Sequence, residues 1–272
     1  MKLRKIFKKE HGIIIGAIHF PPLLGYPDFP GMKAASRNAL QDLKAFSRGG
    51  ADGVIFENNY DIPHTVEADS GTVASMAYLG AEIMRSASIP VGVNVLWNDF
   101  KTGLVLAKIL NLSFIRIPVF VDTVKTNCGV IKGNAREVVA FRKKIKAERV
   151  ALFTDIHVKH SKLLSRYSII ESARRAIKAG SDGLIVTGKW TGDAPSIDEL
   201  ARVRRVVGKF PILVGSGADE KNINTLLRYA NGVIVGTSLK QGNARKGEVN
   251  VKTYKQRISE KKIRQFVATV DK

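Results

Sequence analysis

Short apolar segments that end in glycine constrain this chain most strongly. Two of them stand near the end of the sequence, Pro211-Ile-Leu-Val-Gly-Ser-Gly217 and Gly232-Val-Ile-Val-Gly-Thr237. Both are rich in β-branched residues and apolar on both faces, the pattern of strands buried in a parallel sheet. Glycines at such strand ends let backbone N–H groups approach an anion closely. The pattern therefore predicts a phosphate site, and the alternative is that these glycines only form tight turns.

Eight segments of this kind alternate with helical patterns. The predicted strands cover 12–20, 52–57, 91–96, 114–119, 150–158, 183–188, 211–217 and 232–237. The predicted helices lie near 33–48, 72–87, 100–110, 135–147, 168–179, 196–207 and 222–229, and a loop is expected through 126–133. Strands that alternate with helices form a parallel sheet with right-handed crossovers. In a chain of about 250 residues, a closed α/β fold, the (β/α)8 TIM barrel, fits best, and an open doubly wound sheet is the alternative.

One domain is expected over residues 1–272, with the barrel at about 12–240 and a basic helical extension at about 241–272. Apolar residues at helical spacing within 250–270 predict that this extension ends in an extra C-terminal helix. Three similar segments, Gly50-Ala-Asp-Gly-Val-Ile55, Gly180-Ser-Asp-Gly-Leu-Ile185 and Tyr229-Ala-Asn-Gly-Val-Ile234, precede predicted strands. The similarity of these three segments fits a fold built from a repeated strand–helix unit.

The formal net charge of +20 is concentrated at the two ends of the chain. Residues 1–11 hold five basic residues against one acidic residue, and residues 240–272 hold ten against three. Such a field attracts anionic ligands or binds RNA in a salt-dependent way. No nucleic-acid motif and no basic platform with interleaved aromatic residues is present, so no specific nucleic-acid partner is predicted.

Cysteine content and hydropathy indicate the compartment. The single cysteine, Cys128, excludes an intrachain disulfide and indicates a reducing environment. The basic N-terminal segment lacks the apolar stretch of a signal peptide, and no run reaches the roughly 18 apolar residues of a membrane span. We therefore expect a cytoplasmic protein without membrane insertion, and its oligomeric state is left open, a homo-oligomer included.

Unusual polar residues cluster where the predicted strands end, and in this barrel fold that end carries the active site. Asp155, His157 and Lys159 share one parity on their strand, so Asp155 and His157 should point into the barrel. The catalytic candidates are Glu57, Asp155, His157, His19 and Lys159. The substrate-binding candidates are Asn94, Asn98, Arg116 and Thr187, and the phosphate-binding candidates are Gly188, Gly215, Ser216, Gly217, Gly236 and Thr237.

Several chemistries could use these groups. Arg116, inside an apolar strand, needs an acidic neighbour such as Glu57 or Asp155, or an anionic ligand; a purely structural ion-pair network is the alternative. The two carboxylates could act as a general acid and base. His19 and His157 could hold a divalent metal with either carboxylate, although no cofactor is firmly implied. Lys159 or Lys189 could form a Schiff base with a carbonyl substrate.

Taken together, these segments resemble the BtpA/SgcQ family of barrel proteins. The matching motifs are Ile18-His-Phe-Pro-Pro-Leu-Leu-Gly-Tyr-Pro27, Gly50-Ala-Asp-Gly-Val-Ile-Phe-Glu-Asn58, Val91-Gly-Val-Asn-Val-Leu-Trp-Asn-Asp99, Phe114-Ile-Arg116, Asp155-Ile-His-Val-Lys-His160, Val186-Thr-Gly188 and Val214-Gly-Ser-Gly217. The resemblance implies either a factor for photosystem I biogenesis or a relative of putative sugar-metabolism proteins. The chain departs from the family pattern at Trp97, Pro118 and Asn127.

Two functions follow from these observations. The first is an enzyme that binds a phosphorylated sugar or nucleotide-like small molecule at the barrel mouth and uses acid–base chemistry. The sequence does not distinguish isomerisation, aldol cleavage and hydrolysis. The second is a non-catalytic biogenesis or assembly factor, as in photosystem I biogenesis, that acts through a protein surface. A weaker third hypothesis is that the basic ends bind RNA.

Overall fold

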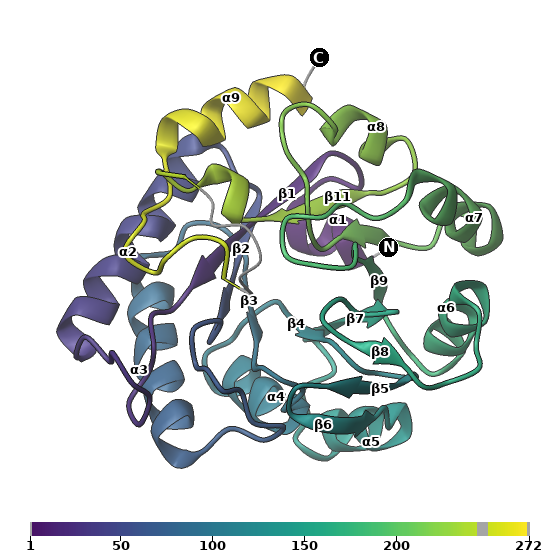
Figure 1. Cartoon of the computed structure of the whole chain (residues 1–272), viewed down its shortest axis with the longest axis horizontal. Coiled ribbons are helices and arrows are strands. Elements are labelled where there is room, and N and C mark those ends of the chain that lie inside the picture. The colour runs from purple at the N-terminus through teal and green to yellow at the C-terminus, as the bar shows by residue number, and fades with distance from the viewer. Residues whose placement is uncertain (1, 244–249, 271–272) are drawn as a thin grey trace.

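The chain folds into a closed barrel of eight parallel strands, as predicted (Figure 1). The computed structural model describes residues 2–243 and 250–270. The barrel strands are β1 (Ile13–His19), β2 (Gly53–Glu57), β3 (Val91–Asn94), β4 (Phe114–Ile117), β7 (Ala151–Ile156), β9 (Gly183–Val186), β10 (Ile212–Val214) and β11 (Gly232–Val235). They pair in the order β1-β11-β10-β9-β7-β4-β3-β2, and β2 closes the barrel by pairing with β1. The carboxyl ends of all eight strands therefore meet at one mouth.

A ring of eight helices surrounds the barrel. The helices are α2 (Met32–Gly49), α3 (Ser70–Ser86), α4 (Phe100–Ile109), α5 (Ala135–Lys144), α6 (Ile169–Lys178), α7 (Ile197–Val207), α8 (Ile223–Leu227) and α9 (Glu260–Val270). The helix expected as a C-terminal addition is α9, which begins about ten residues later than predicted. It packs between α8 and α2 and so completes the ring (Figure 1).

Two elements were not predicted. The expected loop at 126–133 belongs to a small antiparallel sheet made of β5 (Thr123–Thr126), β6 (Gly129–Lys132) and β8 (Lys162–Leu163). Its inner face packs on Trp97, which lies in the loop after β3. The second element is a short N-terminal helix, α1 (Lys2–Phe7).

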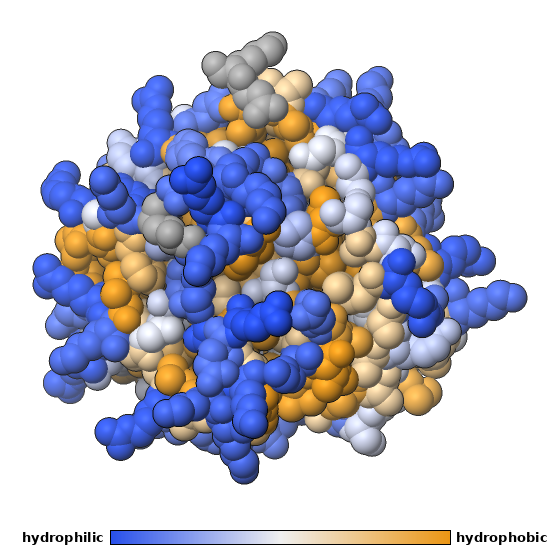
Figure 2. Space-filling model, turned by 180° about the vertical axis from the view of Figure 1, so that it is seen from behind, coloured by the Kyte–Doolittle hydropathy of each residue, from blue (hydrophilic) through white to orange (hydrophobic). Residues whose placement is uncertain are grey.

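Helix α1 closes the end of the barrel opposite the mouth. Leu3 and Phe7 are buried among the side chains that fill the barrel interior, and the rings of Phe7 and Phe114 lie 5.8 Å apart. Lys2 and Lys9 form ion pairs of 2.8 Å with Asp182 and Asp52. Part of the basic N-terminus therefore has a structural role. Hydrophilic side chains project around the edge of this face, with apolar residues between them (Figure 2).

The three similar segments that precede strands share one structural function. The third residue of each segment is Asp or Asn, and its side chain accepts a hydrogen bond from a backbone N–H at the start of the preceding barrel strand. Asp52 accepts from Ile14 at 2.7 Å, Asp182 from Leu152 at 2.9 Å and Asn231 from Ile212 at 2.9 Å. The repeat therefore fixes helix-to-strand turns at the end of the barrel away from the mouth.

The fifth barrel strand ends earlier than predicted. Leu152 and Ile156 face the helices, while Ala151 and Phe153 fill the interior, so the expected alternation is confirmed and Asp155 points inward. The strand β7 stops at Ile156, and His157 adopts a left-handed backbone with φ of 51°. Strand alternation therefore no longer determines where the His157 side chain points.

Candidate functional site at the barrel mouth

Three charged side chains meet inside the mouth. Arg116, on β4, donates from Nε and one terminal nitrogen to the two carboxylate oxygens of Asp155 on β7, each at 2.8 Å. Its other terminal nitrogen lies 3.4 Å from Oε1 of Glu57, at the end of β2. The Arg116, Asp155 and Glu57 side chains are 6%, 0% and 7% exposed. Ions so deeply buried are stable only when paired.

The electrostatics of this cluster follow from burial and pairing. Burial raises the pKa of Asp155, and the Arg116 guanidinium opposes that rise. Burial alone would lower the pKa of Arg116, but Asp155 and Glu57 together raise it above its ordinary value. Arg116 therefore stays charged, and its bidentate geometry is that of a guanidinium bound to a carboxylate.

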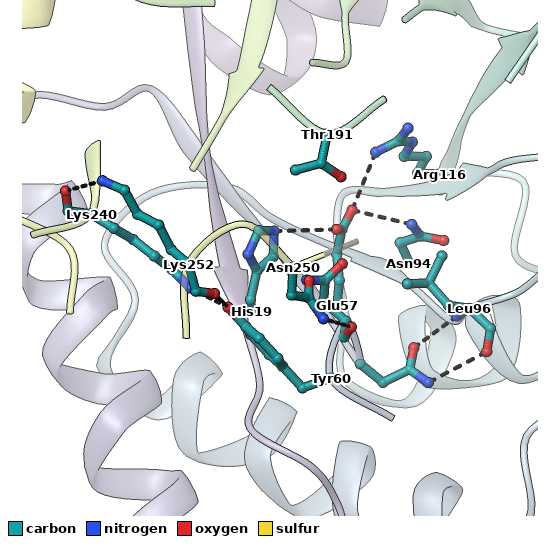
Figure 3. Close-up of polar contacts among 12 residues, drawn as sticks. His19, Glu57, Tyr60, Asn94, Leu96, Arg116, Thr191, Lys240, Asn250 and Lys252 are labelled. Atoms are coloured by element: carbon teal, nitrogen blue, oxygen red, sulfur yellow. Dashed lines mark hydrogen bonds and ion pairs between the residues drawn. The ribbon is translucent and has the colours of Figure 1, made fainter. Parts of the chain in front are cut away.

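Asn94 and His19 also contact Glu57, Asn94 at the oxygen that Arg116 approaches and His19 at the other (Figure 3). Asn94 donates to Oε1 of Glu57 at 3.1 Å, and its own Oδ1 is buried with no hydrogen-bond partner among the described residues. His19 Nε2 lies 3.6 Å from Oε2 of Glu57. Burial, followed by the charges of Lys240 and Lys159, lowers the pKa of His19 well below its ordinary value. His19 is therefore neutral at pH 7 and can accept or donate a proton.

Two lysines add positive charge to the mouth. Burial and the neighbouring Arg116 lower the pKa of Lys159 to about 8, while Glu57 and Asp155 oppose the shift. Burial likewise lowers the pKa of Lys240 to about 8. Lys240 Nζ donates to the hydroxyl of Tyr60 at 2.9 Å. The mouth therefore combines two carboxylates with three basic groups, which favours an anionic ligand.

Two of the predicted site residues hold loops in place. Both polar atoms of the Asn98 amide bind the backbone of Val119, at 3.0 and 2.8 Å. Thr187 Oγ1 accepts from the backbone N–H of Lys159 at 3.0 Å. These contacts favour positioning roles for Asn98 and Thr187. His157 is anchored through its backbone N–H to Asp122 at 3.1 Å, and its ring Nε2 is buried without a hydrogen-bond partner among the described residues.

Five of the six residues predicted to bind phosphate divide into two groups, and the sixth, Gly215, lies beside Arg116, since a Cβ added there would lie 3.4 Å from a terminal nitrogen of Arg116. Ser216 Oγ accepts from Gly188 N–H at 2.9 Å and donates to the carbonyl of Asp193 at 2.8 Å. A side chain at Gly217 would overlap the backbone of Asp193 and Ala194, and Gly217 has φ of 70°. The loop after β9 therefore packs onto the end of β10, so Gly188, Ser216 and Gly217 serve this packing.

The second group, Gly236 and Thr237, lies at the end of β11. Gly236 sits beside His19, because a Cβ added there would lie 3.4 Å from His19 Cε1. Thr237, half-buried, begins the short 3-10 helix η1 (Thr237–Leu239). The first N–H groups of a helix have no partner within it. This end of the mouth adjoins the Glu57 cluster through His19.

The segment at residues 250–258, which we name the C-terminal strap, crosses the mouth near β1 and β2 (Figure 1). Asn250 forms two hydrogen bonds with Asn59, one between the side chains and one from its Nδ2 to the Asn59 carbonyl at 3.0 Å. The Tyr60 hydroxyl donates to the carbonyl of Lys252, and Lys252 Nζ donates to the carbonyl of Lys240 at 2.8 Å. Figure 3 shows Lys240, Lys252 and Tyr60 together at the edge of the site. Sequence reasoning missed Tyr60, Lys240 and the strap.

Potential metal ligands do not gather in this mouth. Within residues 2–243 and 250–270, no group of three or more histidine, cysteine, aspartate or glutamate side chains is arranged to hold a metal ion. Asp155 is bound by Arg116 on both oxygens, and the only carboxylate near His19 among the described residues is Glu57.

None of the described helices is long and apolar enough to span a membrane.

Comparison with known proteins places this geometry in a family. The BtpA family model matches residues 10–272. The photosystem I biogenesis protein BtpA of Synechocystis is 34% identical over 89% of this chain and 84% of its own length. An uncharacterized protein of Archaeoglobus fulgidus is 36% identical over 84% of this chain and 92% of its own length.

Solved structures share the fold at low sequence identity. N-(5'-phosphoribosyl)anthranilate isomerase from Pyrococcus furiosus aligns with a TM-score of 0.55 and 13% identity, over 96% of this chain and 99% of that one. (S)-3-O-geranylgeranylglyceryl phosphate synthase from Thermoplasma acidophilum, in complex with sn-glycerol-1-phosphate, aligns with a TM-score of 0.58 and 14% identity, over 99% and 96% of the two chains. The family model and the curated relatives together cover nearly the whole sequence, and this chain belongs to the BtpA family.

Proposed function

We propose that this protein is an enzyme that binds a phosphorylated sugar or nucleotide-like molecule in the barrel mouth and acts on it by acid–base chemistry. One observation carries the proposal: the carboxylate of Glu57 is buried beside Arg116, the neutral His19 and the unpartnered Oδ1 of Asn94. Buried polar atoms in proteins are normally hydrogen-bonded, so a free one inside a charged mouth favours a bound ligand.

Each group has a role that its contacts support. Glu57 is the general acid or base, since Asp155 is held on both oxygens by Arg116. Asn94 and Arg116 orient the substrate and stabilise negative charge that develops on it. His19, which is neutral and lies between Glu57 and Gly236, exchanges a proton with the part of the substrate nearest the phosphate.

The phosphate lies at the end of β11 in this proposal. The start of η1 has no side-chain cap among the described residues, its first backbone N–H groups lack helical partners, and Lys240 follows η1 directly. The loops after the last two strands bind phosphate in many barrels of this fold. The phosphorylated compounds named for the two solved structures above are consistent with such a site.

Ligand binding tests the proposal directly. Thermal shift would be measured with inorganic phosphate, ribose 5-phosphate, glycerol phosphate and nucleoside monophosphates. A ligand at about a hundred times its dissociation constant stabilises the native state by roughly 2.7 kcal/mol, a readable shift. Thr237→Glu places a carboxylate at the proposed phosphate position and should abolish the shift. Thr225→Glu, an exposed position on α8, makes the same change away from the mouth and should leave the shift intact.

Turnover of any ligand found in this way tests catalysis. Glu57→Gln keeps a polar side chain of equal size and should preserve ligand binding while lowering turnover by about 10²–10⁴-fold. Product formation would be followed by NMR. A shift that survives Thr237→Glu would contradict the phosphate position, and unchanged turnover in Glu57→Gln would contradict the role of Glu57.

A non-catalytic assembly role is the second candidate, favoured by the name of the Synechocystis relative and by one surface feature. The loops after β1 and β2, joined by a hydrogen bond of 2.8 Å from Leu23 N–H to Asp61, expose Leu24, Ile62 and Val66. Exposed apolar residues of this kind can contact a protein partner. A protein that binds none of the phosphorylated probes would favour this role over the enzyme.

A further inference from the structure

Beyond the acid–base cluster, the mouth carries a group of aromatic and imidazole side chains with no role so far. Trp190 stands in the loop after β9, and its indole lies with its centroid 5.5 Å from that of the His160 ring. His160 belongs to the segment after β7, and His64 belongs to the loop after β2. The backbone carbonyl of His64 accepts a hydrogen bond of 2.8 Å from Cys128 in the hairpin of β5 and β6, and β5 pairs with β8, which follows His160 closely in the chain. Three loops that are distant in sequence thus bring planar side chains together.

Two polar atoms in this group lack partners. The Nδ1 atoms of His64 and His160 are both buried without a hydrogen bond to any described residue, and His64 is only 9% exposed. Burial lowers the pKa of each ring to about 4, so both are neutral at pH 7. A neutral imidazole offers one donor and one acceptor nitrogen. Two such rings can recognise a ligand edge that carries both donors and acceptors.

Trp190 contributes a stacking surface. Its side chain is 52% exposed, although tryptophan buries the largest apolar area of any residue. The loop that carries it is held firmly. His160 Nε2 is 2.7 Å from Thr191 Oγ1, and the backbone N–H of His160 donates to the carbonyl of Lys189 at 3.1 Å. An exposed but firmly positioned indole is a platform on which a planar ring can stack.

This group is continuous with the site already described. His160 directly follows Lys159, whose backbone N–H is bound at 3.0 Å by Thr187 just after β9. Figure 3 includes Thr191, the partner of His160, in the same close-up as Arg116 and Glu57. The proposed phosphate position at β11 and the Trp190 loop after β9 are separated around the barrel by β10 and its loop. A ligand that spans the end of β10 can therefore reach from one to the other.

We propose that Trp190, His160 and His64 form a subsite for a planar heteroaromatic ring, so that the substrate is a nucleotide-like molecule and not a simple sugar phosphate. The ring stacks on Trp190, and its polar edge binds the free imidazole nitrogens. This inference rests on the proposed function, since the phosphate and sugar of the same ligand occupy the mouth. To that function it adds the chemical class of the part of the substrate that is neither phosphate nor sugar.

Affinity for matched probes tests the subsite. Dissociation constants would be measured by calorimetry for ribose 5-phosphate, the common nucleoside monophosphates and the corresponding nucleosides. At least one nucleoside monophosphate should bind about tenfold or more tightly than ribose 5-phosphate, since stacking of a base commonly contributes that much. Trp190→Ala should remove this preference and leave the affinity for ribose 5-phosphate unchanged. Trp190→Phe should retain part of it.

The control variant is Tyr78→Ala. Tyr78 on α3 is 52% exposed, as Trp190 is, but does not lie in a loop at the mouth, so its removal should change no affinity. Quenching of Trp190 fluorescence by the bound base gives an independent readout, which Trp190→Phe would abolish.

The outcomes separate this inference from the proposed function. Equal affinity for ribose 5-phosphate and every nucleotide would overturn the subsite and leave the phosphate site standing. Loss of ribose 5-phosphate binding in Trp190→Ala would show a structural role for Trp190, and would also overturn the subsite. Binding of nucleosides without any gain from their phosphate would support the subsite and contradict the phosphate position. Absence of binding by every probe would overturn both proposals.

Discussion

Arg116→Met removes a guanidinium that two buried carboxylates share. The Asp155 side chain is 0% exposed and the Glu57 side chain 7% exposed, so neither can recover its hydration when Arg116 is lost. Two unit charges about 4 Å apart interact by about 4 kcal/mol at an effective dielectric constant of 20. Breaking a buried pair from one side typically costs 3–5 kcal/mol. We expect the free energy of unfolding at pH 7 to fall by about that amount.

Urea unfolding at pH 7 and pH 5 measures this loss. With Arg116 absent, burial raises the pKa of Asp155 in the folded state without opposition from the guanidinium, so the folded protein takes up a proton before the unfolded chain does. The loss should therefore shrink as the pH falls from 7 to 5, because protonation removes the buried charge. The double variant Arg116→Met/Asp155→Leu should recover part of the stability, since it replaces the Arg116–Asp155 pair by apolar side chains while Glu57 remains without Arg116.

The exposed pair Arg264–Glu260 on α9 provides the control. Arg264 is 64% exposed, and Arg264→Met should cost well under 1 kcal/mol. A loss below about 1 kcal/mol for Arg116→Met, with no recovery in the double variant, would refute the description of the cluster as buried and mutually paired.

Two further predictions concern the loops of the mouth. Burial depresses the pKa values of His64 and His160 to about 4, so the unfolded chain takes up these protons first and stability should fall as the pH drops from about 6.5 to 4. His64→Gln or His160→Gln should each reduce the slope of the unfolding free energy against pH by up to about 1.4 kcal/mol per pH unit, measured by urea unfolding. Ser216→Ala should cost about 1–3 kcal/mol and speed amide exchange at Gly188, because it leaves Gly188 N–H and the Asp193 carbonyl without their partner. Ser238→Ala, which removes one hydrogen bond to Ala218, should affect exchange at Gly188 little.

The barrel could be predicted because its strands carry a strong local signal. Each is a short apolar run bounded by glycine, proline or polar residues, and the alternation on β7 correctly placed Asp155 inside. The hairpin of β5 and β6 gave no such signal, because its strands have four residues each and one mostly exposed face. Helix α1 was missed because its burial depends on two residues, Leu3 and Phe7, within a basic segment. Their spacing of four was the one available indication.

The same distinction separates the parts of the site that were found from those that were missed. Glu57, Arg116 and Asp155 were candidates because a charge within an apolar strand needs a partner, whatever the fold does elsewhere. Tyr60 and Lys240 gave no such sign, since their hydrogen bond joins positions 180 residues apart. Asn250 and Asn59 lie 191 residues apart. Such contacts depend on the path of the strap across the mouth, which no local pattern determines.

Ser216 shows how one sequence motif can suit two roles. A glycine-rich turn with a hydroxyl residue suits two tasks equally, since both need backbone groups at close range and a small side chain. One task is binding phosphate, and the other is packing a neighbouring loop. The hydroxyl of Ser216 bonds at both ends to the loop after β9, as the second task requires, and phosphate binding by Gly188, Ser216 and Gly217 stays a prediction. That loop carries Trp190 and Thr191, so Ser216 acts on ligand recognition through the position of these residues.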